Sequence, residues 1–179
     1  RSNNYLNYQL FNIRYTSSYY EGNNFQSHHM LQGQWAKENL KAYGYDYKKA
    51  PTISLGTGYY SDRNGNKKVA PHTIANNSQG DRLRARGGDY SSTLNCELIF
   101  GATDLVKSGM SEEVVLSELE RNYKMLDALN EQNREKILKG DLVKIEYDRE
   151  TIEQAVREQV EEEKNKNVCK ENWGEKWVF

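Results

Sequence analysis

The sequence predicts an α+β domain: polar strands and loops, then a strand-helix-strand-helix order and an acidic C-terminal tail. Three observations predict this class. The first half is rich in Asn, Tyr, Ser and Gly and has short alternating runs. A mostly apolar run follows at 93–100, and the second half has two long segments with apolar residues at helical spacing. The length of 179 residues fits one domain. We therefore expect a single α+β domain over 1–160 and an acidic extension over 161–179.

The first half predicts few regular elements. Residues 6–15 alternate in the manner of a strand with both faces partly covered. Residues 31–43 have near-helical apolar spacing and end before Gly44, which predicts a short helix. Residues 45–92 form a long irregular basic region, in which Asn64-Gly65 predicts the tight turn of a hairpin. Within it, residues 78–92 have the composition of a mobile loop.

The second half is more regular. We expect a buried strand at 93–100 that includes Cys96, and then a long helix that is capped by Ser111 and ends at Gly140. Leu119 and Leu126 should share the core-facing stripe of that helix. A short strand at 142–147 precedes a second helix, which Asp148 caps and which becomes fully polar from Glu161 and projects into solvent. The aromatic residues after it predict a segment that docks on a partner or on the domain itself: Trp173, Trp177 and Phe179.

Composition argues against several classes of protein. The hydrophobic fraction is 36 % and the mean hydropathy is −0.97, both low for a self-contained enzyme. No run approaches the length of a membrane span and no signal peptide is visible, so no membrane partner is expected. Cys96 and Cys169 are too far apart for a disulfide framework or a zinc pattern. This cysteine usage favours a reducing intracellular compartment or a virion.

Charge is divided unevenly along the chain. Residues 1–92 hold 12 Lys/Arg and 6 Asp/Glu, whereas residues 93–179 hold 13 and 20. The basic half contains a cluster in which Arg and Lys could bind phosphates and Tyr could stack on bases. The candidate nucleic-acid-binding residues are Lys67, Lys68, Arg82, Arg84, Arg86, Tyr59 and Tyr60. The alternative is a solvated loop, or one that binds an acidic protein surface such as the acidic half of another copy.

The histidines predict no catalytic site by themselves. His28 and His29 are adjacent, so in regular structure they point in different directions, and His72 is distant in sequence. Local hydrogen bonding is the favoured interpretation, and a metal site that joins His28 or His29 to His72 and a carboxylate is the alternative. The chain has no nucleophile elbow, phosphate-binding glycine loop, dinucleotide fingerprint or HExxH motif. We therefore assign no catalytic residue, metal or cofactor.

Two short stretches resemble a known family. Arg1-Ser2 followed by residues 6–10 resembles the front of plasmid mobilisation relaxases, and residues 94–100 with the following helix resemble their next strand and helix. Tyr19-Tyr20 is similar to the pair in tyrosine-nucleophile relaxases. The resemblance implies a DNA-processing protein with a His-hydrophobic-His metal motif on a later strand. The corresponding stretch here, residues 143–148, has no His, so the metal site would be absent or built from carboxylates.

The sequence as a whole favours a non-catalytic role. Low apolar content, long polar loops, the charge split and the aromatic terminus favour a structural or adaptor component of a larger assembly, with a phage or virus particle as the leading interpretation. Its partners would be other protein subunits, including copies of itself. The alternative is a nucleic-acid-binding or relaxase-like DNA-processing protein.

Overall fold

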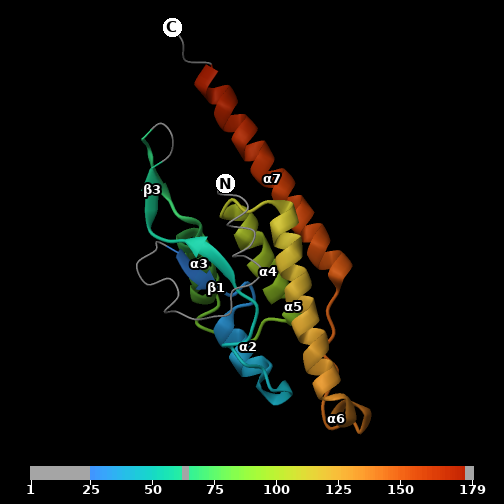
Figure 1. Ribbon diagram of the computed structural model, residues 1–179. Helices are drawn as coiled ribbons and strands as arrows, with labels where there is room; N and C mark the ends of the chain where they lie inside the picture. Colours follow the sequence, from blue (N-terminus) through green and yellow to red (C-terminus); the bar gives the residue numbers. More distant parts are fainter. Residues whose placement is uncertain (1–24, 62–64, 176–179) are drawn as a thin grey trace.

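The protein is an α+β domain in which a small β-sheet and its helix lie against a layer of long helices (Figure 1). The structure, a computed structural model, describes residues 25–61 and 65–175. Strands β1 (Phe25–His28) and β2 (Ile53–Gly56) pair antiparallel, with Phe25 opposite Gly56 and His28 opposite Ile53. Helix α3 (Pro71–Ala85) packs on this pair and on α4 (Leu94–Lys107). The fold class predicted from the sequence is confirmed.

Short elements precede and follow β2 along the chain. Helix α2 (Gly33–Asn39) and the 3₁₀ turn η2 (Lys41–Tyr43) lie between β1 and β2, and Gly44, with φ at +85°, ends them as predicted. The predicted hairpin is also present: β3 (Tyr59–Ser61) pairs antiparallel with β4 (Lys67–Val69) between β2 and α3, although Asn64 of its predicted turn lies outside the described residues. This ribbon is a second two-stranded sheet, and in Figure 1 it extends away from the β1–β2 pair.

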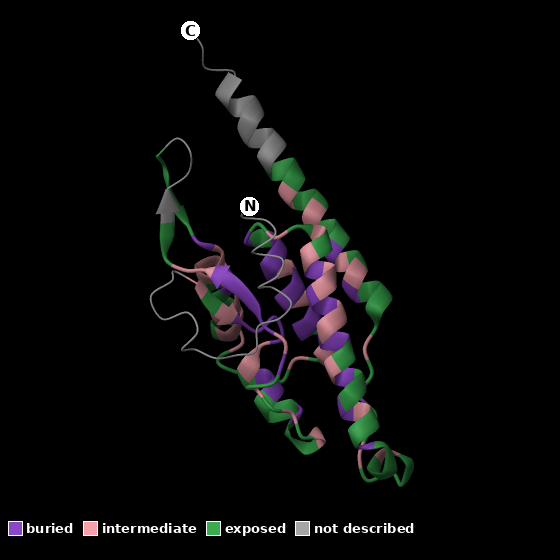
Figure 2. Cartoon of the chain, in the orientation of Figure 1, coloured by how far each residue is buried: buried purple, intermediate pink, exposed green. Residues whose placement is uncertain are grey.

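The helical layer holds the core. Helix α5 (Glu112–Gln132) begins at Ser111, whose side chain accepts a hydrogen bond from the backbone of Val114, as the predicted cap requires. Leu119 and Leu126 are fully buried, so their predicted place on the inner stripe is confirmed. They pack in one cluster with α4 and α7 (Arg149–Glu175) through residues such as Leu98, Leu105, Ile152 and Val156. Figure 2 shows this buried seam between the long helices.

Two predictions for residues 78–100 are wrong. The expected mobile loop at 78–92 is helical as far as Ala85, and the expected strand at 93–100 is the first half of α4. A short apolar run fits a buried helix as well as a strand, and Thr93 decides for the helix because its hydroxyl caps the backbone N–H of Cys96. Cys96 is consequently exposed on the helix surface, whereas the sequence predicted it to be buried.

Two more predictions need correction. The segment 142–147 is not a strand, because the backbone of Ile145 bonds to the side chain of Asn130 at both its N–H and its carbonyl. Helix α5 ends at Gln132 and not at Gly140, and the short helix α6 (Arg134–Leu138) follows it.

The C-terminal helix agrees in part with expectation. Asp148 caps it, and residues 161–166 are mostly exposed where α7 runs beyond its neighbours (Figure 2). Trp173 lies in α7, while Trp177 and Phe179 lie outside the described residues, so the docking segment stays a prediction. The strand predicted at 6–15 also lies outside them. Among the described residues, no helix has the length and apolarity needed to span a bilayer.

Candidate active site

A polar pocket of about 370 Å³ opens where β1 ends, between α2 and α3. Its described lining contains all three histidines of the chain, His28, His29 and His72, together with Lys37 and Tyr47. Four amide side chains complete most of the wall: Gln32, Gln34, Asn76 and Gln79. No Asp or Glu belongs to this lining, and Lys37 is its one lysine or arginine. The pocket is thus suited to an anion, which amide groups and an ammonium group can bind.

His28 is the most deeply placed of the three histidines. It is the last residue of β1, and its ring meets the ring of His72 edge to face with 5.6 Å between centroids. Burial, followed by the nearby His72, lowers the pKa of His28 to about 3, so its imidazole is neutral. Its Nε2 atom is buried and forms no hydrogen bond with any described residue. A buried nitrogen without a protein partner is uncommon in folded proteins, and a water, an ion or a ligand can satisfy it.

His29 is held in one orientation. Its ring stacks on Tyr47 at 4.0 Å between centroids, and its Nε2 lies 3.0 Å from the Tyr47 backbone carbonyl. A carbonyl only accepts, so Nε2 carries the proton and Nδ1 carries the ring's lone pair. Burial lowers the pKa of His29, which keeps the ring neutral at pH 7.

His72 and Asn76 come from one face of α3, one turn apart. The Asn76 amide nitrogen lies 3.2 Å from His72 Nδ1, which fixes the ring against the neighbouring amide. Burial lowers the pKa of His72 as well. Pro71 starts the helix, so both side chains stand in its first two turns, near the positive end of the helix dipole.

Two glycines allow the close packing behind this pocket. A Cβ on Gly101 of α4 would lie 2.0 Å from the backbone oxygen of Met30, the residue after His29. A Cβ on Gly33 would lie 2.5 Å from the ring of Tyr47. Only glycine permits these approaches, so α4 supports the His28-His29 segment directly and α2 presses Tyr47 against His29.

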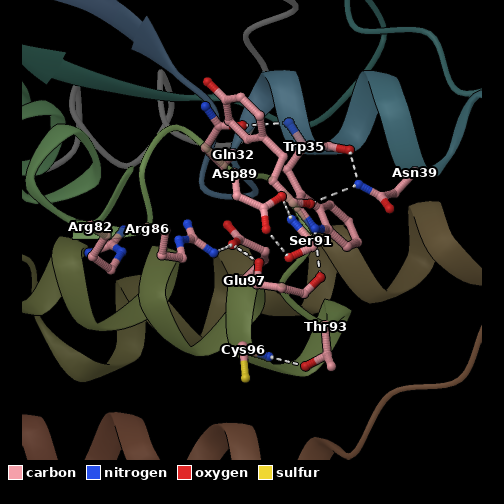
Figure 3. Close-up of polar contacts among 12 residues, drawn as sticks. Gln32, Trp35, Asn39, Arg82, Arg86, Asp89, Ser91, Thr93, Cys96 and Glu97 are labelled. Carbon is pink, nitrogen blue, oxygen red and sulfur yellow. Dashed lines mark hydrogen bonds and ion pairs between the residues drawn. The ribbon is translucent and has the colours of Figure 1, made fainter. Parts of the chain in front are cut away.

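A polar cluster fastens α2 to the helical layer (Figure 3). The Trp35 indole donates to the backbone carbonyl of Ser92 at 2.8 Å, and Ser92 in turn donates to the buried Glu97 of α4. Arg86, just after α3, pairs with the same Glu97 at 3.1 Å. These contacts hold α2, α3 and α4 in one arrangement and therefore fix the walls of the pocket.

The structure divides the basic cluster predicted from the sequence. Arg82 and Arg86 pair with the buried carboxylates of Asp104 and Glu97, so both guanidinium groups bind α4. Arg84 pairs with Asp81 on the helix surface. The other four candidates, Tyr59, Tyr60, Lys67 and Lys68, belong to the β3–β4 ribbon.

The histidine pair is brought together by the end of a strand. Alternation along a continuous strand would turn His28 and His29 apart, but β1 stops at His28, so both side chains line the same pocket. Local hydrogen bonding, the favoured interpretation, is found for His29 and His72. His28 contacts the ring of His72, but no Asp or Glu lies with them in the described lining, so the alternative metal site with a carboxylate is not found there. The signal in the sequence was the triplet Ser27-His28-His29, and sequence reasoning gave it no weight.

The sequence model of one family matches residues 22–127, a range that contains the whole pocket. That family is Tox-SHH, HNH/Endo VII superfamily toxins with a SHH signature. The chain belongs to this family. Ser27-His28-His29 is the one SHH triplet in the sequence, and it ends the strand that lines the pocket. No curated protein and no solved structure matches the chain.

Membership of Tox-SHH overturns the main functional prediction. A structural, adaptor or virion component is the wrong class, because the family points to a nuclease-like toxin. The alternative of a protein that acts on nucleic acid agrees better with it. The relaxase resemblance does not carry over: residues 94–100 are helical, and residues 1–20 lie outside the described chain.

Proposed function

We propose that this Tox-SHH chain is a metal-dependent nuclease module that hydrolyses phosphodiester bonds in nucleic acid. One observation carries the proposal: three histidines with lowered pKa values converge on a pocket whose described lining holds no Asp or Glu, and the buried Nε2 of His28 has no protein partner among the described residues. HNH-type toxin domains act on nucleic acid, which agrees with a pocket built for an anion.

The residues present fit a divalent cation. His28 and His72 offer neutral imidazoles from two elements. The contact of His72 Nδ1 with the Asn76 side-chain amide leaves Nε2 of His72 as the nitrogen for a metal, which requires the Nδ1 proton to point at the amide oxygen. The described residues contain no group of three or more His, Cys, Asp and Glu side chains suited to a metal, so the phosphate and water would supply the remaining ligands. A donor set of imidazoles without carboxylates favours Zn²⁺, Ni²⁺ or a similar borderline metal over Mg²⁺ or Ca²⁺.

The side chains of the pocket have different roles in hydrolysis. His29 Nδ1 takes the proton from the attacking water, while the Tyr47 carbonyl holds the opposite nitrogen and keeps the ring in that tautomer. The bond from water oxygen to phosphorus forms as the bond to the leaving oxygen breaks. Lys37 and the amide side chains bind the phosphate and orient it. A bound divalent cation would act as a Lewis acid toward the phosphate.

Cleavage of supercoiled plasmid and of total RNA tests this function. The purified protein is incubated with either substrate in Zn²⁺, Ni²⁺, Mn²⁺ or Mg²⁺, and in EDTA. We expect cleavage with at least one metal and none in EDTA. His29→Ala should lower the rate by 10² to 10⁴, the usual contribution of a general base. Lys139→Ala, after α6 and outside the pocket lining, is the matched control and should cleave normally.

Metal binding provides an independent measurement. Calorimetric titration with Zn²⁺ or Ni²⁺ should show one site that is lost in His28→Gln and in His72→Gln but retained in His29→Ala. Absence of cleavage with every metal on both substrates would refute the nuclease proposal. Metal affinity that is unchanged in His28→Gln would refute the assignment of the ligands.

A further inference from the structure

The β3–β4 ribbon leads directly out of the candidate active site. It joins β2, whose partner strand ends at His28, to α3, which carries His72. The base of the ribbon is closed by a hydrogen bond of 2.9 Å from the Ala70 N–H to the Gly58 carbonyl. His72 follows Ala70 by two residues, so the ribbon is rooted next to the pocket. Figure 1 shows β3 and β4 extending from this base away from the helices.

One face of the ribbon carries exposed groups that the fold does not use. The register places Tyr59 opposite Val69, and Lys67 precedes Val69 by two residues on the same strand, so these three residues share a face. Tyr59 is 62 % exposed, Val69 is 40 % exposed, and Lys67 is also exposed. Solvent-facing aromatic and aliphatic side chains on a narrow ribbon contribute little to stability, so their surface is accessible to a ligand.

The positive charge of this face is complementary to the negative charge of a polyanion. Lys67 Nζ lies 4.1 Å from the centre of the Tyr59 ring, and no described residue forms an ion pair with Lys67. The described residues of the ribbon, 59–61 and 65–69, include two lysines and no acid. The described part of the ribbon therefore resembles the described pocket lining, which also has a lysine, Lys37, and no carboxylate.

We infer that this face of the ribbon is a nucleic-acid-binding arm, which holds the strand that runs into the pocket. Lys67 binds a phosphate, and Tyr59 stacks on a base or sugar beside it. An aromatic ring next to a cation is the usual platform for a nucleic-acid strand, and a two-stranded ribbon also fits the major groove of a duplex. The inference rests on the proposed function, since it assigns a longer binding track to the same substrate.

Binding in EDTA tests the arm separately from catalysis. Fluorescence anisotropy would measure the affinity of the whole protein for a labelled 20-nucleotide strand and for the corresponding duplex, between 50 and 200 mM salt. Each phosphate contact contributes about 0.7 to the log–log salt slope for a single strand and about 0.9 for a duplex. We expect Lys67→Ala to flatten the slope by about that amount, and Tyr59→Ala to weaken binding about tenfold.

A matched control and three outcomes decide the result. Lys139→Ala also removes an exposed lysine, at the α6 end of the molecule opposite the ribbon in Figure 1, and should change neither slope nor affinity. A stronger effect of Tyr59→Ala on the single strand would identify unpaired bases as the ligand, and a slope change on duplex alone would identify the duplex backbone. Affinity and slope unchanged in the Tyr59→Ala/Lys67→Ala double variant would overturn the arm, even if metal-dependent cleavage is observed. Loss of cleavage in all metals with arm-dependent binding intact would refute only the nuclease proposal.

Discussion

The ion pair between α3 and α4 offers the sharpest test of how the pocket is held. Asp104 is fully buried and accepts two hydrogen bonds from Arg82, at 2.7 and 2.5 Å, and one from Ser78 at 2.6 Å. Asp104→Ala leaves the Arg82 guanidinium without its partner. Breaking a buried pair in this way costs about 3–5 kcal/mol. The Arg82 side chain is 21 % exposed and keeps some water, so we expect a loss near the lower end, about 3 kcal/mol.

Urea denaturation at pH 7 measures this loss, and a second pair on the same helix is its control. Arg84 and Asp81 also form an ion pair, but both side chains are more than 70 % exposed, so Asp81→Ala should cost less than about 1 kcal/mol. The double variant Arg82→Met/Asp104→Leu should recover most of the loss, because it leaves no buried charge. If Asp104→Ala costs no more than Asp81→Ala, the pair does not hold α3 on α4 and the reasoning is wrong.

Three further predictions concern the core and the pocket. Leu126→Ala should cost about 2–5 kcal/mol in the same assay, and a cost under 1 kcal/mol would place Leu126 outside a well-packed core. Gly101→Ala should push α4 away from Met30 and lower the melting temperature. Gly109 has open space around its Cβ position, so the only cost of Gly109→Ala should be the backbone strain at φ +97°, and its melting temperature should fall less. His28 has a pKa of about 3 in the folded protein and about 6.5 when unfolded, so it makes stability fall as the pH drops from 6.5 toward 3. The fall approaches about 1.4 kcal/mol per pH unit, and it should be weaker in His28→Gln; equal pH profiles would contradict the burial of a neutral ring.

Local signals in the sequence were sufficient wherever one residue decides the structure. Ser111 and Asp148 cap their helices, Gly44 ends η2, and the helical stripe of α5 places Leu119 and Leu126 in the core. The hairpin at 59–69 was also predictable, because its turn sequence favours positive φ. Caps and turns depend on neighbours along the chain, so the sequence by itself determines them.

The elements that the sequence misread depend on distant partners. The arginines at 82–86 resemble those of a mobile loop, because the carboxylates that bind Arg86 and Arg82 belong to Glu97 and Asp104, 11 and 22 residues further along the chain. The run at 94–100 is apolar enough for a strand, and becomes a helix because its length and its Thr93 cap let it pack against α3, α5 and α7.

The candidate site shows the same division. The sequence contains His28, His29 and His72 and the Ser-His-His triplet, but adjacent residues on a strand point apart, and 43 positions separate His29 from His72. The tertiary structure brings them together because β1 ends at His28, Gly101 lets α4 approach Met30, and α3 packs with its first turn beside that strand end. The sequence determined which chemical groups are available. Only the packing of α3 and α4 on the short sheet decided that these groups face one pocket, because that packing joins segments which no local pattern connects.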